Sequence, residues 1–363
     1  MRGLTQLIKH LLQPRLKRLD TVERVLGGAR FTVADVGSTG GMDAKWSPLQ
    51  PIANVYAFDP DSRATAGDQQ VTVLPFGLWS CEATLPLHLT RFPPASSVFP
   101  HNQALLGDFL NADCHRVVAR KEIAVRTMAS ALKGMAAPDF IKVDAEGADL
   151  AILEGAQEFV QSICVGIQAE VQFVERNLAS PTFARIDEFL QSRGYMLLTL
   201  QREFWIRNNK AWGITSQAQL IWADAVYLLS VERALARAVE LGPADRHRLL
   251  AKLVAASAVY GAHDYAMDAI RRFREHGFAE VGVADALSGF IRANVSSTGV
   301  ELLRRFLHLV LAFVILLGAV FVSSQRKRAV QFARLSAARF FHSLYLSCAR
   351  TGENRVAISD GAV

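Results

Sequence analysis

Between residues 31 and 230, short apolar runs bounded by turn residues alternate with segments in which apolar residues recur every three or four positions. The first pattern predicts buried strands and the second predicts amphipathic helices. The predicted strands cover residues 32–36, 54–58, 71–74, 139–143, 163–171, 195–200 and 219–229. Because strands and helices alternate along the chain, we expect an α/β domain with a mainly parallel sheet and helices on both faces.

The pattern changes on either side of this segment. Residues 231–300 are rich in Ala and Leu at helical spacing, and helices are predicted over 231–241, 246–259 and 265–276. We therefore divide the chain into four parts. They are a basic amphipathic helical leader (1–30), the α/β domain (31–230), a helical region (231–300), and a hydrophobic helix with a basic amphipathic tail (301–363).

Glycines follow the acid that ends the first predicted strand. Asp35 and Val36 are followed by Gly37, and Gly40 and Gly41 come shortly after. Such a turn lets the backbone approach a bulky ligand closely. In a methyltransferase Gly37 would leave room for the adenosine and methionine carbons of S-adenosylmethionine, and Asp35 would hold the methionine ammonium group directly or through water. A dinucleotide site prefers G-x-G-x-x-G, which is absent, and an ordinary tight turn is a third interpretation.

The next two strands also end in candidate ligand contacts. Asp59 stands at the carboxyl end of the second strand, where an acid can accept hydrogen bonds from both ribose hydroxyls. The alternative is a helix cap, since Asp59-Pro60 suits a helix start. Phe76 follows the third strand and is a candidate for packing on the adenine ring.

The predicted strand over 139–143 breaks its apolar pattern with Lys142 and is followed by two acids, Asp144 and Glu146. A helix is predicted after it, over 149–159. Ligands of open α/β sheets bind at the carboxyl ends of strands, so these acids are candidate site residues. An ion pair that caps the following helix is the alternative.

One segment resembles a known family. Residues 139–156 read D-F-I-K-V-D-A-E-G-A-D-L-A-I-L-E-G-A, which is similar to the hallmark of FkbM-type methyltransferases, with Asp149 where the family usually has Glu. The resemblance covers roughly residues 31–210, although the glycine turn departs from the family's D-V-G-A-N-x-G. It implies a Rossmann-like class I methyltransferase sheet, S-adenosyl-L-methionine as methyl donor, and methylation of an oxygen, often a sugar hydroxyl.

Methyl transfer from a sulfonium needs alignment of the acceptor oxygen with the S–CH₃ bond and gains from a nearby base. Asp144 is our first candidate for that base, Glu170 at the end of the fifth strand is the second, and Glu146 is the third. His101 is a further possible base. We expect no metal, although Asp144 and Glu170 sharing a divalent cation is an alternative.

The charge and the cysteine content indicate which compartment and which partners to expect. The net charge is +6 and the sequence pI is about 9.3, but the basic residues gather at the two ends, so we expect no nucleic acid. The four cysteines match no zinc pattern and are expected to be free thiols of a reducing compartment. Nothing in the sequence predicts the oligomeric state.

Residues 306–322 form an apolar run interrupted only by His308 and flanked by Arg304-Arg305 and by Arg326-Lys327-Arg328. Its length approaches the hydrocarbon thickness of a bilayer, so we expect membrane attachment, either spanning or monotopic, on the cytoplasmic face. The leading hypothesis is a membrane-associated O-methyltransferase for a glycan, a glycolipid or a related small molecule. The alternatives are a catalytically silent methyltransferase-like interaction module and a nucleotide-dependent oxidoreductase.

Overall fold

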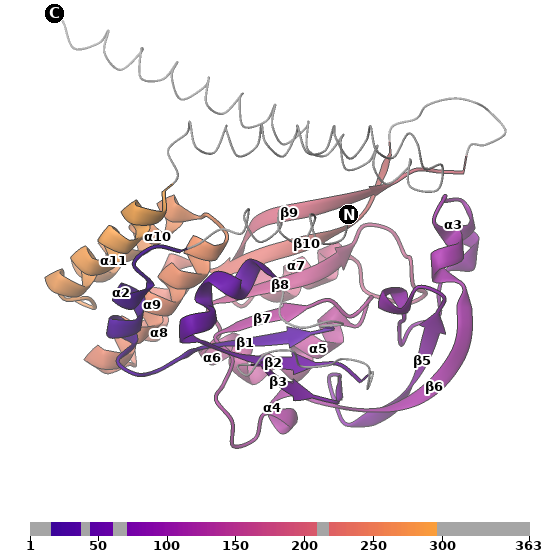
Figure 1. Ribbon diagram of the computed structural model, residues 1–363, viewed down its shortest axis with the longest axis horizontal. Coiled ribbons are helices and arrows are strands. Elements are labelled where there is room, and N and C mark those ends of the chain that lie inside the picture. The colour runs from indigo at the N-terminus through magenta and orange to yellow at the C-terminus, as the bar shows by residue number, and fades with distance from the viewer. Residues whose placement is uncertain (1–15, 38–43, 61–70, 209–217, 296–363) are drawn as a thin grey trace, which may run out of the picture. The chain divides into compact units, whose positions relative to one another are not determined.

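The computed structural model describes residues 16–37, 44–60, 71–208 and 218–295. Its centre is a seven-stranded sheet (Figure 1). The first five strands in sheet order are parallel, whereas β10 runs antiparallel to β8 and to β9. In sheet order the strands are β3 (Val71–Leu74), β2 (Ala53–Phe58), β1 (Phe31–Val36), β7 (Phe140–Val143), β8 (Gly166–Gln172), β10 (Gln219–Leu229) and β9 (Tyr195–Trp205).

This sheet confirms the predicted α/β fold with a mainly parallel sheet. All seven predicted strands are present, and two differ clearly in length. The strand predicted from residue 163 begins at Gly166, because residues 163–165 complete the turn after a helix. The strand predicted to end at residue 200 continues to Trp205, because β10 pairs with it along its whole length. The order reverses between β1 and β7, which is the switch point where doubly wound sheets bind ligands.

Helices cover both faces of the sheet. On one face, Phe31 of β1 and Phe140 of β7 pack on Trp46 of η1 (Ala44–Ile52), and Tyr260 stacks on Phe140. On the other face, Tyr227 of β10 donates a hydrogen bond to Asp187 of α7 at 3.0 Å. The helices that follow strands β7 and β8 are α5 (Asp149–Gly155), α6 (Gln157–Ser162) and α7 (Phe183–Gln191).

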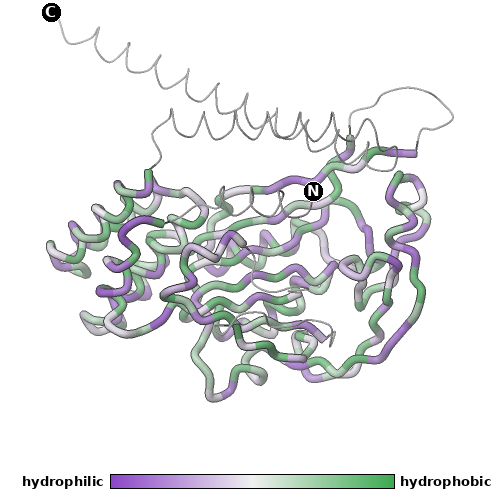
Figure 2. Tube along the Cα trace, in the orientation of Figure 1, coloured by the Kyte–Doolittle hydropathy of each residue, from purple (hydrophilic) through white to green (hydrophobic). Residues whose placement is uncertain are grey.

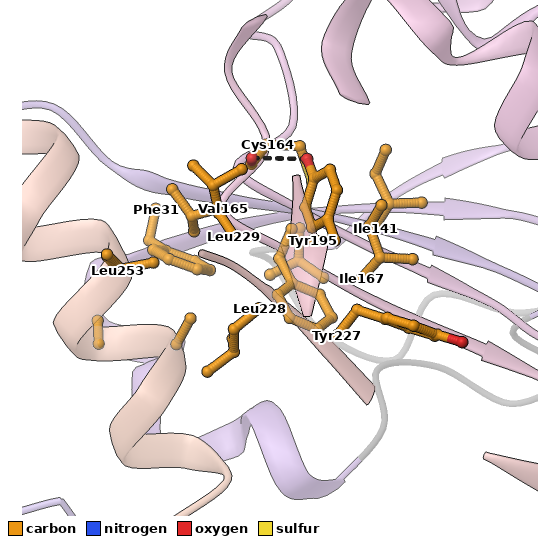
Figure 3. Close-up of a cluster of buried hydrophobic side chains, with 14 of the residues drawn as sticks. Phe31, Ile141, Cys164, Val165, Ile167, Tyr195, Tyr227, Leu228, Leu229 and Leu253 are labelled. Atoms are coloured by element: carbon orange, nitrogen blue, oxygen red, sulfur yellow. Dashed lines mark hydrogen bonds between the residues drawn. The ribbon is translucent and has the colours of Figure 1, made fainter. Parts of the chain in front are cut away.

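The C-terminal helices pack into the same core as the sheet. Leu253 lies in one buried cluster with Phe31 of β1 and Leu228 of β10 (Figure 3). Lys252 reaches Asp139, just before β7, at 2.7 Å. The described residues up to Asn294 accordingly belong to one compact unit. Its remaining helices are α2 (Leu19–Leu26), α8 (Val231–Val239), α9 (Pro243–Val259), α10 (His263–Glu275) and α11 (Val281–Asn294).

The segment of the chain between β3 and β7 forms a second, three-stranded sheet, which the sequence analysis did not predict. Its order is β4 (Gly77–Leu78), β6 (Val117–Arg126) and β5 (Ala83–Thr90), and it curves away from the central sheet (Figure 1). Leu85, Leu87 and Leu89 alternate with other residues in β5, which is an edge strand and therefore tolerates Pro86. Strand β6 carries a hydrophilic stretch at residues 120–122 (Figure 2). The short helices η2 (Pro93–Ala95), α3 (Gln103–Gly107), η3 (Ala112–His115) and α4 (Met128–Ala131) belong to this part of the chain.

The structure differs from one predicted helix and does not describe another. The single helix predicted over 149–159 is wrong, because the chain breaks at Ala156 into α5 and α6. At the end of α5, Gly155 lies so close to the Trp79 carbonyl that a Cβ there would be 2.0 Å from that oxygen. The predicted membrane segment 306–322 lies outside the described residues. Among the helices that the model does describe, none is long and apolar enough to cross a bilayer.

Candidate functional site

The carboxyl ends of β2, β1 and β7 meet at one edge of the sheet. Val36 is in register with Phe58 on one side and with Val143 on the other, so the next residue of each strand is Gly37, Asp59 or Asp144. The Gly37 amide donates to the Phe58 carbonyl at 3.0 Å, and the Asp144 amide donates to the Val36 carbonyl at 3.1 Å. The structure therefore brings together the acids and the glycine turn that the sequence singled out.

Gly37 turns the chain in a left-handed conformation, with φ of +82°. A Cβ at this position would be 1.9 Å from the backbone oxygen of Asp144, so no other residue fits without moving the loop after β7. The described contact of Gly37 is thus with the neighbouring strand end, and its predicted approach to a ligand stays a prediction. Gly40 and Gly41 lie outside the described residues.

Asp35 and Lys142 form a buried ion pair beside this edge. The Lys142 Nζ lies 3.1 Å from Asp35 Oδ1 and 3.8 Å from Asp144 Oδ2. The Asp35 side chain is only 2% exposed, whereas that of Asp144 is 40% exposed. Of the two acids, Asp144 is thus the one that an external ligand can reach, and Lys142 keeps a positive charge next to it.

Glu146 and Glu170 share a single buried cation, Arg176. The Arg176 guanidinium lies 3.0 Å from Glu146 Oε2 and also donates a short hydrogen bond to Glu170 Oε1. Burial raises the pKa of Glu146, and raises that of Glu170 well above its usual range, although Arg176 opposes both shifts. Burial alone would lower the pKa of Arg176, but the two carboxylates raise it. With one guanidinium for two carboxyls, the pair holds a proton more tightly than isolated glutamates do.

Three further positions surround the cluster. The Asp149 side chain is buried behind the loop, where burial and then the charge of Asp144 raise its pKa to about 7. Burial lowers the pKa of His101, whose Nε2 lies 2.9 Å from the Ala95 carbonyl. Burial, followed by the charge of Arg176, also lowers the pKa of His115, to about 4. Both histidines are therefore neutral near pH 7.

Phe76 follows β3, which pairs with β2 and so ends on the same side of the sheet. Its ring is half-buried and carries the Arg126 guanidinium 4.0 Å from the centroid. The position is compatible with a wall of the site beyond Asp59, and the cation over the ring is an additional feature that the sequence did not predict.

Sequence reasoning missed Arg176 and Asn177, in the loop after β8. Arg176 contacts both predicted acids, and the Asn177 Nδ2 donates to the Glu146 carbonyl at 2.8 Å. Their only sequence signal was a pair of polar residues just beyond a predicted buried strand. Within the described ranges, no group of three or more His, Cys, Asp or Glu side chains is arranged to hold a metal ion. The Glu170 carboxylate, proposed above as one half of an alternative cation site, contacts Arg176.

Part of the chain is similar to a known protein family. Residues 53–197 match the family model of the methyltransferase FkbM domain. No curated protein is detectably similar to the chain. Among solved structures, a similar one is a Pyrococcus horikoshii protein proposed to be an RNA methyltransferase, at 11% identity and a TM-score of 0.24. The match covers 60% of this chain and 88% of that protein.

Proposed function

We propose that the protein transfers a methyl group from S-adenosylmethionine to a hydroxyl of a glycan, a glycolipid or a related small molecule, since residues 53–197 match the family model of the methyltransferase FkbM domain. The observation that carries the proposal is the meeting of Asp59, the Gly37 turn and Asp144 at the ends of three adjacent parallel strands. Ligands of doubly wound sheets bind at this edge, beside the switch point.

The residues at this edge suit an adenosine-bearing donor. Asp59 directly follows β2 and is the acid that can accept the two ribose hydroxyls. Gly37 presents backbone without a side chain, and Phe76 lies beyond Asp59 as an apolar surface for the adenine. Asp35, the candidate for the methionine ammonium group, is buried in an ion pair with Lys142, so we assign it to holding Lys142 beside Asp144.

The bound donor supplies a methyl group that is already activated on sulfur. Asp144 is the residue that we assign to the acceptor, because its carboxylate is the most exposed of the three candidate acids. It accepts the hydroxyl proton as the new C–O bond forms and the S–CH₃ bond of the donor breaks, which leaves S-adenosylhomocysteine. A base in this position typically contributes about 10²–10⁴-fold. Glu170 and Glu146 are buried against Arg176, and we assign them to holding the site rather than to the proton transfer.

Calorimetric titration of the full-length protein with S-adenosylhomocysteine tests the donor. Asp59→Asn should weaken binding at least about tenfold, because it removes a charged acceptor of two hydrogen bonds. Asp245→Asn, on the surface of α9, is the matched control and should bind like the wild type. Absence of heat at millimolar ligand would remove the methyltransferase assignment, and binding of NADH instead would favour the oxidoreductase alternative.

Methyl incorporation tests the acceptor. Radiolabelled S-adenosylmethionine is offered with a panel of glycans and glycolipids, and Asp144→Asn is the paired variant. We expect label in a hydroxylated acceptor with the wild type, and a loss of methyl transfer of about 100-fold or more with Asp144→Asn. Label in RNA instead of a glycan would refute the proposed acceptor class.

We also propose that residues 306–322 attach the protein to the cytoplasmic face of a membrane. The support is the apolar run with basic residues at both ends in the sequence. Deletion of residues 301–363 should move the protein from the membrane pellet to the supernatant. Continued sedimentation of the deleted protein with membranes would contradict the attachment.

A further inference from the structure

The loop between β7 and α5 contains two residues with positive φ angles. Glu146 has a φ of +49°, and Gly147 follows with a φ of +100°. A left-handed conformation is unfavourable for a residue with a side chain and persists where surrounding contacts impose it. Gly147 adopts a positive φ without this penalty, so it is Glu146, at the edge of the proposed donor site, that needs support from other parts of the chain.

Side chains from two distant segments supply that support. The Glu146 carbonyl accepts a hydrogen bond from Ser97 Oγ at 2.7 Å and another from Asn177 Nδ2 at 2.8 Å. The Glu146 carboxylate lies 3.0 Å from Arg176. Thus both ends of the Glu146 residue are held, and three donors converge on one residue.

Arg176 is itself fixed from several sides. It is 3% exposed, it pairs with Glu170 inside β8, and its guanidinium lies 5.7 Å from the Trp205 ring and 5.9 Å from the Trp222 ring. Contacts with aromatic rings and carboxylates restrict the position of the buried guanidinium. The loop after β7 is therefore tied to the far half of the sheet, on the β8, β9 and β10 side.

The same loop touches the donor side directly. The Asp144 backbone oxygen is the atom against which Gly37 packs, and the Asp144 amide bonds to Val36. A shift of Glu146 moves a residue only two positions from Asp144. The contacts form a chain from Arg176 through Glu146 to Asp144 and Gly37.

We propose that Arg176 and Asn177 are positioning residues that hold Glu146 in its left-handed conformation and thereby place Asp144 and the Gly37 turn for the donor. This inference rests on the proposed function, since the donor is the ligand whose binding reports on the loop. Neither residue touches the reacting atoms, because both act through Glu146.

The matched control for Arg176 is Arg237. Its guanidinium also ties down backbone around β8, but at the opposite end of the strand, by donating to the Cys164 carbonyl at 2.7 Å and to the Val160 carbonyl at 2.8 Å. Arg176→Gln and Arg237→Gln should both lower the melting temperature. Only Arg176→Gln should also change the loop after β7.

Two measurements on the full-length protein test this. Titration with S-adenosylhomocysteine should give a dissociation constant at least about tenfold higher for Arg176→Gln, and within about twofold of the wild type for Arg237→Gln. Hydrogen exchange without ligand should be faster at the amides of residues 144–149 in Arg176→Gln only. Arg176→Lys keeps the charge but not the forked geometry. Its dissociation constant and its exchange rates should therefore lie between those of the wild type and those of Arg176→Gln.

If Arg176→Gln does not fold, Asn177→Ala and the Ser97→Ala/Asn177→Ala double variant replace it. Asn177→Ala removes one hydrogen bond to the Glu146 carbonyl, and Ser97→Ala removes the other together with the bond that Ser97 Oγ accepts from the Phe99 amide. Wild-type exchange at residues 144–149 together with wild-type affinity in these variants would overturn the inference. A wild-type protein that binds no S-adenosylhomocysteine would instead overturn the proposed function, while the exchange data would still report on the loop.

Discussion

Replacement of Gly37 by alanine tests how closely the turn after β1 packs against the loop after β7. The new Cβ would lie 1.9 Å from the Asp144 oxygen and 2.9 Å from its carbonyl carbon, and both are backbone atoms that no rotamer change can remove. The left-handed φ of +82° adds a conformational cost of about 1–2 kcal/mol for a residue with a Cβ. Overpacking adds about 1–3 kcal/mol, so the total loss of stability should be about 2–5 kcal/mol.

Gly28 offers a matched control for this substitution. Its φ is +86°, but a Cβ there would have no atom within 4 Å. Gly28→Ala should therefore lose only the conformational part, about 1–2 kcal/mol. The difference between the two variants isolates the steric contact between the β1 turn and the loop after β7.

Urea denaturation followed by circular dichroism gives the two free energies of unfolding. Calorimetry with S-adenosylhomocysteine then shows whether the displaced loop also weakens donor binding, as we expect for Gly37→Ala only. Equal stability of the two variants, with equal affinity, would show that the turn and the loop do not press on each other as described, and the packing argument would be wrong.

Three further predictions concern the core. Lys252→Met should destabilise the protein by about 3 kcal/mol, because it leaves the Asp139 carboxylate buried without its cation; a loss below 1 kcal/mol in urea denaturation would contradict this. The folded protein holds the Asp149 proton up to about pH 7, whereas the unfolded chain releases it near pH 4. This group therefore makes stability fall as pH rises between about 4 and 7, and Asp149→Asn should flatten that fall in urea titrations at several pH values; an unchanged slope would argue against the raised pKa. Deletion of residues 231–363 should abolish cooperative thermal unfolding, since α9 contributes to the core of the sheet; a sharp calorimetric transition in the shortened chain would show that residues 1–230 fold alone.

The edge of the sheet was predictable because the rule behind it is local. An acid or a glycine that follows a buried parallel strand must lie at the same edge as its counterparts on neighbouring strands, so Asp59, Gly37 and Asp144 could be grouped from sequence alone. Gln219–Leu229 was predicted with its observed bounds, since its apolar pattern is long and its flanks are polar.

What the sequence did not reveal are choices between distant partners. That Arg176 would pair with Glu146, thirty positions away along the chain, depends on the path of the loop after β8, for which no local pattern exists. Likewise the alternating Leu85, Leu87 and Leu89 fit a strand, but a strand of mixed apolar and polar residues needs a partner, and nothing local identifies β6. The packing of α9 on β10 and η1 belongs to the same class of long-range contact.

The position of β1 inside the sheet, between β2 and β7, has a consequence for the synthesis of the chain. Its neighbour β7 is translated about a hundred residues later, and Arg248 of α9, which donates to the Leu26 carbonyl, is 222 positions away. At a synthesis rate of about 5–20 residues per second, the first strand leaves the ribosome roughly 10–40 s before the helix that covers it. During that interval Phe31 and Val33, which are buried in the folded protein, are apolar surface on a growing polypeptide.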